Sequence, residues 1–153
     1  MVGSGGKWSE VFLGEYAHTL DEKGRMIVPA RFREELGPSF VVTRGLDRCL
    51  FVYPLPEWEA LAGKLRALPL TKADTRAFVR LLFSGACECA LDKQGRILLP
   101  PALRAYAGIQ RDVVSIGVAN RVEIWAAEEW AKYTDAATES YEAIAEKIVD
   151  LGI

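Results

Sequence analysis

Two stretches of nearly the same pattern decide the fold: LDEKGRMIVPARFREELG at residues 20–37 and LDKQGRILLPPALRAYAG at residues 91–108. Each contains Leu-Asp-x-x-Gly-Arg, then three apolar residues, a proline and a short segment that ends at glycine. A hexapeptide repeated by chance would not bring the rest of the stretch with it. The pattern therefore indicates an internal duplication.

The correspondence continues outside these stretches. An offset of 71 positions also aligns Gly14 with Gly85, and one inserted residue changes the offset to 72, which aligns Trp58 with Trp130. The unit is longer than a solenoid repeat and occurs only twice. We interpret the chain as a tandem domain and not as a repeat array.

Composition places the chain among globular proteins, because half of its 153 residues are hydrophobic and 26% are charged. No apolar run reaches the length of a membrane span. Residues 1–10, MVGSGGKWSE, lack the apolar centre of a signal peptide, and we interpret them as an N-terminal extension or flexible linker. Three cysteines without framework spacing suit a reducing cytoplasm better than a secreted domain.

Each unit is predicted to begin with a short strand that ends in a tight turn, DEKG or DKQG. Asp21 and Asp92 can accept backbone hydrogen bonds there, and Gly24 and Gly95 tolerate the positive φ that such a turn needs. The chain then returns through the apolar strands RMIVP and RILLP, which end at proline.

A short helix, a second hairpin and a longer helix are predicted to follow in each unit. Pro29 and Pro100 suit the first helical position, and Gly37 and Gly108 suit the left-handed position after the helix. FVVTR is expected to pair with CLFVY, and VVSIG with VEIWA. Each unit therefore contains four strands.

Four strands and one short helix are too few to close a core alone. The returning strands MIV and ILL show no polar alternation, so we expect both of their faces to be covered. We predict one mainly β, α+β domain in which the two repeats intertwine around a pseudo-twofold axis. The expected boundaries are 12–57 for the first repeat, 58–84 for connecting helices, 85–128 for the second repeat and 129–153 for a C-terminal helix.

Amphipathic helices are predicted outside the repeats. Two helices are expected between the repeats. The second, TKADTRAFVRLLF, begins with Thr71-x-x-Asp74, which resembles a capping box. In the C-terminal segment, apolar positions alternate four and three apart, as in a seam that packs against another helix. The seam consists of Trp130, Thr134, Ala137, Tyr141, Ile144, Ile148 and Leu151. It could pack on its own domain or on another copy of the chain.

The sequence offers little for catalysis. His18 is the only histidine, so no Ser/His/Asp or Cys/His set can be built without it. A metal site of His18, Cys87 and Cys89 lacks a familiar spacing, and simple burial is favoured. Asp21 and Asp92 could form an acid–base pair, but their turn positions favour a structural role. We expect no enzymatic activity, cofactor or small-molecule substrate.

Charge is unevenly distributed along the chain. Residues 21–33 and 92–104 each have a balance of +2, whereas residues 123–150 have a balance of −6. Two basic tips related by a twofold axis could reach two positions on a DNA duplex, and arginine suits both guanine edges and phosphates. The pI of about 5.5 counts against DNA binding.

The two stretches at residues 20–37 and 91–108 resemble the swapped-hairpin DNA-binding module of the bacterial AbrB-type transition-state regulators. Two copies in one chain, followed by YPLPEWEALAGKL and VEIWAAEEW, are similar to the MraZ family from about Phe12 to the C-terminus. This resemblance implies a cytoplasmic, nucleoid-associated regulator of the division and cell-wall gene cluster. It also implies binding to short G-rich direct repeats, usually with repression, by a ring-like homo-oligomer.

The resemblance further implies that Arg25 and Arg96 are the principal DNA-contacting residues. The supporting candidates are Lys23, Arg31, Arg33, Lys93 and Arg104. The second repeat has Gln94 where the first has Lys23, so its DNA contact is expected to be weaker or mainly structural.

Two functions remain open at this point. The first is sequence-specific DNA binding, in which each domain has low, salt-sensitive affinity and linked domains gain about 10²–10⁴ in avidity. The alternative is a protein-interaction module of the antitoxin-like swapped-hairpin class, which neutralises a partner protein and does not bind DNA.

Overall fold

A computed structural model describes residues 11–148 and residue 152. The expected extension at residues 1–10 lies outside the described residues. In chain order the elements are β1 (Glu15–Thr19), β2 (Arg25–Ile27), α2 (Ala30–Leu36), β3 (Phe40–Arg44), β4 (Leu50–Pro54), α3 (Leu55–Arg66), α4 (Ala73–Ser84), β5 (Cys87–Cys89), β6 (Arg96–Leu98), α5 (Pro101–Ala107), β7 (Asp112–Val118), β8 (Arg121–Ala126), α6 (Ala127–Glu139) and α7 (Tyr141–Lys147).

The strands of the two repeats are interleaved. A six-stranded antiparallel sheet has the order β1-β7-β8-β4-β3-β5, and a separate ribbon pairs β2 with β6. In the second repeat, β5, β7 and β8 are the counterparts of β1, β3 and β4. Exchanging each strand for its counterpart gives the same strand order read from the opposite edge of the sheet. The pseudo-twofold axis therefore passes between β4 and β8, which confirms the intertwined α+β fold.

The first strand of each repeat pairs with the other repeat. β1 pairs with β7, and β5 pairs with β3. The returning strands β2 and β6 pair with each other. The second hairpins, β3–β4 and β7–β8, form within their own repeats as predicted.

Side chains from both repeats share one core. Phe32 of α2 is fully buried, and its ring packs edge-on against Phe12 at 5.8 Å and Tyr16 at 5.2 Å between centroids. Its counterpart Leu103 of α5 is buried in the same cluster. A smaller aromatic cluster includes Trp125 and is partly covered by residues of α3 and α6.

The expectation that both faces of the returning strands are covered is wrong. Met26 and Ile97 are 1% exposed, but Ile27 is 57% exposed and Leu98 is 55% exposed. Successive side chains of a strand point to opposite faces. The β2–β6 ribbon places only one of its faces on the core, so the alternate side chains face outward.

Short-helix boundaries differ slightly from the prediction. Pro29 and Pro100 were expected at the first helical position, but they are the N-cap residues of α2 and α5, so each helix begins one residue later than predicted. Gly108 has the predicted left-handed conformation, with φ of 65° and ψ of 27°. Gly37 shares the positive φ, 78°, but its ψ of −173° is extended.

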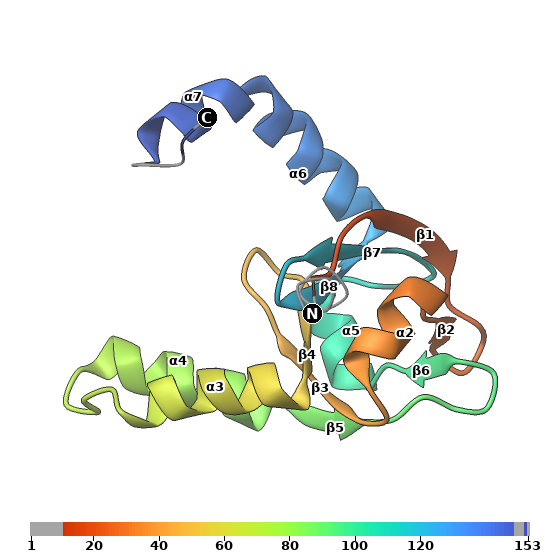
Figure 1. Cartoon of the computed structure of the whole chain (residues 1–153), viewed down its shortest axis with the longest axis horizontal. Coiled ribbons are helices and arrows are strands. Elements are labelled where there is room, and N and C mark those ends of the chain that lie inside the picture. Colours follow the sequence, from red (N-terminus) through yellow and green to blue (C-terminus); the bar gives the residue numbers. More distant parts are fainter. Residues whose placement is uncertain (1–10, 149–151, 153) are drawn as a thin grey trace.

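The helices outside the repeats differ more from the prediction than the short helices do. The predicted capping box does not form, because Lys72 is extended and α4 begins at Ala73 without a side-chain cap. The expected single C-terminal helix is divided into α6 and α7 at Ser140. Figure 1 shows α3–α4 and α6–α7 extending from the sheet as two separate arms, at the end of the molecule away from β2 and β6.

Candidate nucleic-acid interface

The first turn is built around the carboxylate of Asp21. Its Oδ1 accepts hydrogen bonds from the backbone N–H groups of Lys23 and Arg25, both at 2.9 Å. The N–H of Gly24 donates to the carbonyl oxygen of Asp21 at 3.0 Å, and Gly24 has φ of +84°. The sequence Asp-x-x-Gly-Arg therefore closes this turn through local contacts.

The second turn repeats this geometry. Oδ1 of Asp92 accepts hydrogen bonds of 2.9 Å from the backbone N–H groups of Gln94 and Arg96. Gly95 donates to the carbonyl oxygen of Asp92 at 3.0 Å and has φ of +78°. The replacement of a lysine by Gln94 does not change the turn, because that residue contributes only its backbone N–H.

Each aspartate also holds the arginine that ends its turn. Oδ2 of Asp21 accepts a 2.7 Å hydrogen bond from Nε of Arg25, and Asp92 binds Nε of Arg96 at the same distance. Nη1 of Arg96 lies 3.8 Å from Oδ2 of Asp21 and so connects the two turns. The arginine side chains are 29% and 25% exposed, respectively.

These contacts keep both carboxylates ionised. The pKa of Asp21 is lowered to about 2, above all by the backbone hydrogen bond from Arg25. The pKa of Asp92 is lowered mainly by the equivalent bond from Arg96. Neither group carries a proton near neutral pH, so the pair is unsuited to general acid catalysis.

Arg33 and Arg104 lie against the turn of the opposite repeat. A Cβ atom added to Gly24 would lie 2.8 Å from Cζ of Arg104, and one added to Gly95 would overlap the guanidinium of Arg33. Nε of Arg104 also donates to the carbonyl oxygen of Leu99 at 3.0 Å. Both arginines thus pack beneath glycines that have no side chain.

An open groove of about 750 Å³ adjoins the first turn. Four cationic side chains line it, and they come from both repeats: Lys23, Arg25, Arg104 and Arg111. Sequence reasoning missed Arg111, because the repeat alignment places Ser39 opposite it and so gives no repeated signal. Asp21 and Glu22 also line the groove, so four cations stand against two anions there.

The other candidates are exposed and lie outside this cluster. Arg31 is an exposed residue of α2, and Lys93 is an exposed residue of the second turn. Neither lines the groove. The candidate interface therefore combines Arg25 and Arg96 of the two turns with Arg33 and Arg104, which pack against the glycine of the opposite turn.

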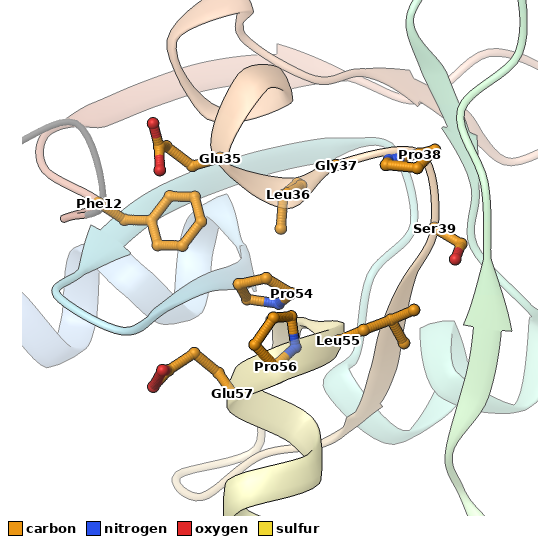
Figure 2. A pocket seen from close by; sticks show the side chains of 10 residues that line it. All are labelled: Phe12, Glu35, Leu36, Gly37, Pro38, Ser39, Pro54, Leu55, Pro56 and Glu57. Carbon is orange, nitrogen blue, oxygen red and sulfur yellow. The ribbon is translucent and has the colours of Figure 1, made fainter. Parts of the chain in front are cut away.

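An apolar pocket of about 510 Å³ lies between the end of α2 and the start of α3. Figure 2 shows Phe12, Leu36, Pro54 and Pro56 facing this space. Its charged lining residues are Glu35 and Glu57. Because an acidic, apolar lining repels phosphate, this pocket does not belong to the candidate nucleic-acid interface.

The possible metal ligands do not form a site. His18 lies on β1 and the two cysteines lie on β5, which are the outer strands of the six-stranded sheet. Nε2 of His18 lies 2.9 Å from Oγ of Ser115, and burial lowers the pKa of His18. Within residues 11–148, no group of three metal-binding side chains gathers. None of the helices in that range is long and apolar enough to cross a membrane.

The duplicated architecture corresponds to a known family model. The model described as "MraZ protein, putative antitoxin-like" matches the chain twice, over residues 11–81 and 82–151. The chain belongs to the MraZ family. The boundary between the two matches lies inside α4, and each match contains one set of the repeated strands, so the matches correspond to the duplication that the pseudo-twofold sheet displays.

Several relatives in the MraZ family match along almost the whole chain. Proteins named transcriptional regulator MraZ from Syntrophomonas wolfei and Pelotomaculum thermopropionicum are each 61% identical over 143 residues. The aligned region covers 94% of this chain and 100% and 99% of those proteins, respectively. The protein of that name from Moorella thermoacetica is 59% identical over 143 residues, with 94% and 100% coverage. The family is thus one of transcriptional regulators and not of enzymes.

Proposed function

We propose that this chain binds double-stranded DNA sequence-specifically through the β2–β6 ribbon and its turns, and regulates transcription. The expected output is repression of its own division and cell-wall gene cluster. One observation carries the proposal: two Asp–Arg pairs with the same 2.7 Å contact stand on one ribbon. The relatives named as transcriptional regulators support it.

The Asp–Arg pairs are suited to reading guanine. Nε of each arginine is bound by its aspartate, and Nη1 of Arg96 also lies 3.8 Å from Asp21, so the donors proposed for a ligand are the other terminal Nη nitrogens. An arginine that is already held in place loses less side-chain entropy on binding. Its planar donors match the O6 and N7 acceptors of guanine in the major groove. This supports short G-rich repeats as the target.

The surrounding cations are suited to phosphates. Lys23, Arg104 and Arg111 share the groove beside Arg25, against Asp21 and Glu22 in the same lining. The second turn has Gln94 in place of Lys23 and Lys93 in place of Glu22, and no such groove with cations of both repeats adjoins it among the main pockets of the described residues. Phosphate contacts fix the register of a protein on the duplex. We therefore expect the first turn to bind DNA more tightly than the second.

A ring-like homo-oligomer is supported by the two helical arms. The α3–α4 arm, residues 55–84 with the segment between its helices, has five basic and three acidic residues, and the α6–α7 arm, residues 127–147, has six acidic and two basic residues. Both arms expose large apolar side chains, including Phe78 and Leu81 on α4 and Tyr141 and Ile144 on α7. Contact between unlike surfaces of successive copies is heterologous and closes into a ring when the rotation permits.

Direct repeats in the DNA fit such an assembly. Each domain offers few cationic groups, so its affinity for a single repeat is low and falls with salt. Domains linked in one oligomer bind neighbouring repeats together and gain avidity. A protein that binds such repeats in chromosomal DNA is located in the cytoplasm, at the nucleoid.

The test is fluorescence anisotropy on duplex DNA from the region upstream of the gene, at several salt concentrations. Arg25→Ala/Arg96→Ala should lower affinity at least about tenfold, because each bidentate arginine contact contributes about 1–3 kcal/mol. The salt dependence should also become less steep. Unchanged affinity in a correctly folded double variant would overturn the proposal.

The matched control is Arg66→Ala/Arg80→Ala, which removes two exposed arginines from the α3–α4 arm. On a duplex with a single repeat, avidity does not contribute, and this control should bind as the wild type does. Circular dichroism and thermal unfolding establish that all variants are folded.

The antitoxin-like alternative is favoured by the wording of the family model. In that case the chain neutralises a protein partner, and the ribbon is free of DNA in the cell. The same double variant separates the two functions. Absence of DNA binding by the wild type at every salt concentration would favour the protein partner, whereas DNA binding that does not depend on Arg25 and Arg96 would overturn the assignment of the ribbon.

A further inference from the structure

The outward face of the β2–β6 ribbon combines arginine with aliphatic side chains. Arg25 and Ile27 alternate with buried Met26 along β2, and Arg96 and Leu98 share the same face of β6. The two aliphatic residues are 57% and 55% exposed. They occupy equivalent positions in the two repeats, so each repeat exposes one aliphatic side chain on this face.

The strand register places each aliphatic residue opposite an arginine. Leu98 pairs with Arg25, and Ile27 pairs with Arg96. Directly opposed Cβ atoms in an antiparallel pair lie about 4.5–5.5 Å apart. The side chains of each arginine and its branched apolar partner therefore leave the ribbon side by side, and each aspartate restricts the position of the guanidinium.

A ligand for this face must offer acceptors and apolar groups side by side. A solvated ribbon face usually carries polar side chains at such positions. The major groove of DNA admits a two-stranded β-ribbon, and its floor presents guanine O6 and N7 and also the C5-methyl group of thymine. Both chemical groups that the ribbon face requires are thus present in one groove.

We propose that Ile27 and Leu98 are specificity residues that contact thymine C5-methyl groups next to the guanines bound by Arg96 and Arg25. This inference rests on the proposed DNA-binding function. It adds base pairs with thymine to the recognised sequence, at positions set by the register of the ribbon. The aspartates assist by preventing each arginine from swinging across the neighbouring base pair.

The test is a thermodynamic cycle that removes either partner of the contact. Replacing thymine by uracil deletes the C5-methyl group and preserves base pairing. Ile27→Ala/Leu98→Ala deletes the side-chain partner on an exposed face, so the core remains intact. Anisotropy titrations compare the wild type and this variant on thymine and uracil versions of the upstream duplex, one strand substituted at a time.

The wild type should bind the uracil duplex about fourfold more weakly for each contacted thymine, which is the value of one buried methyl group. The Ile27→Ala/Leu98→Ala variant should bind thymine and uracil duplexes equally. A variant that retains the wild-type preference for thymine, or a wild type without that preference, overturns the inference. Thermal unfolding checks that the variant is folded, and Ile27→Leu should retain a preference for thymine.

The outcomes separate this inference from the function on which it rests. If Arg25→Ala/Arg96→Ala loses DNA affinity but uracil has no effect on the wild type, only the role of the aliphatic residues is wrong. If the arginine variant binds as the wild type does, the proposed function itself fails.

Discussion

The backbone N–H of Val28 donates a 2.9 Å hydrogen bond to the carbonyl oxygen of Gly95, in the turn of the opposite repeat. Leu99 makes the equivalent 3.0 Å bond to Gly24. Each turn therefore depends on the returning strand of the other repeat. The two candidate DNA-reading arginines are positioned by one shared structure and not by two independent modules.

This exchange predicts that neither repeat folds alone. Fragments 11–84 and 85–153 each lack the strand that pairs with their first strand and the partner of their returning strand. Each fragment should show no cooperative thermal transition by circular dichroism, whereas an equimolar mixture should recover one. A cooperative transition in either isolated fragment would show that the exchange is not required.

Alanine at either turn glycine should destabilise the protein. Gly24 and Gly95 have φ of +84° and +78°, where an L-residue costs about 1–2 kcal/mol, and the added Cβ must displace Arg104 or Arg33. Urea unfolding of Gly24→Ala and Gly95→Ala measures this loss. The control is Gly63→Ala in α3, where a Cβ meets open space, and a gain of about 0.5–1 kcal/mol is expected.

Acid should weaken the fold through the turn aspartates. The folded-state pKa of Asp21 is about 2, below its ordinary value of 3.8, and the pKa of Asp92 is lowered as well. Their contribution is complete above about pH 4 and is lost as the pH falls toward 2. The free energy of unfolding, measured by urea titration between pH 7 and pH 2, should fall less steeply in Asp21→Asn/Asp92→Asn than in the wild type.

The same aspartates should matter for DNA affinity at neutral pH, although they are negatively charged. Asp21→Asn removes the anion that holds Nε of Arg25, so the arginine must be ordered on binding. We expect weaker binding to the upstream duplex despite the gain of one positive unit in net charge. Glu22→Gln makes the same change in charge in the same turn and should bind equally or more tightly. Tighter binding by Asp21→Asn would mean that charge alone governs the interface.

Removal of α7 should weaken binding to several repeats but not to one. A chain that ends at residue 139 keeps the ribbon and α6 but loses the exposed apolar side chains of α7. Light scattering should report a smaller assembly, and anisotropy should show reduced affinity only for duplexes with several repeats. Ile144→Ser, at an exposed position, serves as the point variant. An unchanged assembly in both would exclude α7 from the contact between copies.

Particular residues show which structural features the sequence predicts and which it does not. Asp21, Gly24 and Arg25 are bound to one another within five positions, so their turn was predicted from local chemistry. The sequence does not predict the exposure of Ile27, because a strand of consecutive apolar residues has the same pattern whether one of its faces or both are covered. Arg111 has no basic counterpart in the first repeat, where Ser39 occupies the aligned position. The break at Ser140 interrupts an apolar spacing that continues through it.

By itself, the sequence determined that the chain is duplicated, where its turns lie and which arginine ends each turn, because those features depend on residues that are close along the chain. Only the tertiary structure decided which strands pair, which face of the β2–β6 ribbon meets solvent and which distant cations join Arg25 in the groove. Those outcomes depend on contacts such as His18 with Ser115, 97 positions apart. Many pairings of similar strands satisfy the same local pattern, and the packing of both repeats around one core selects among them.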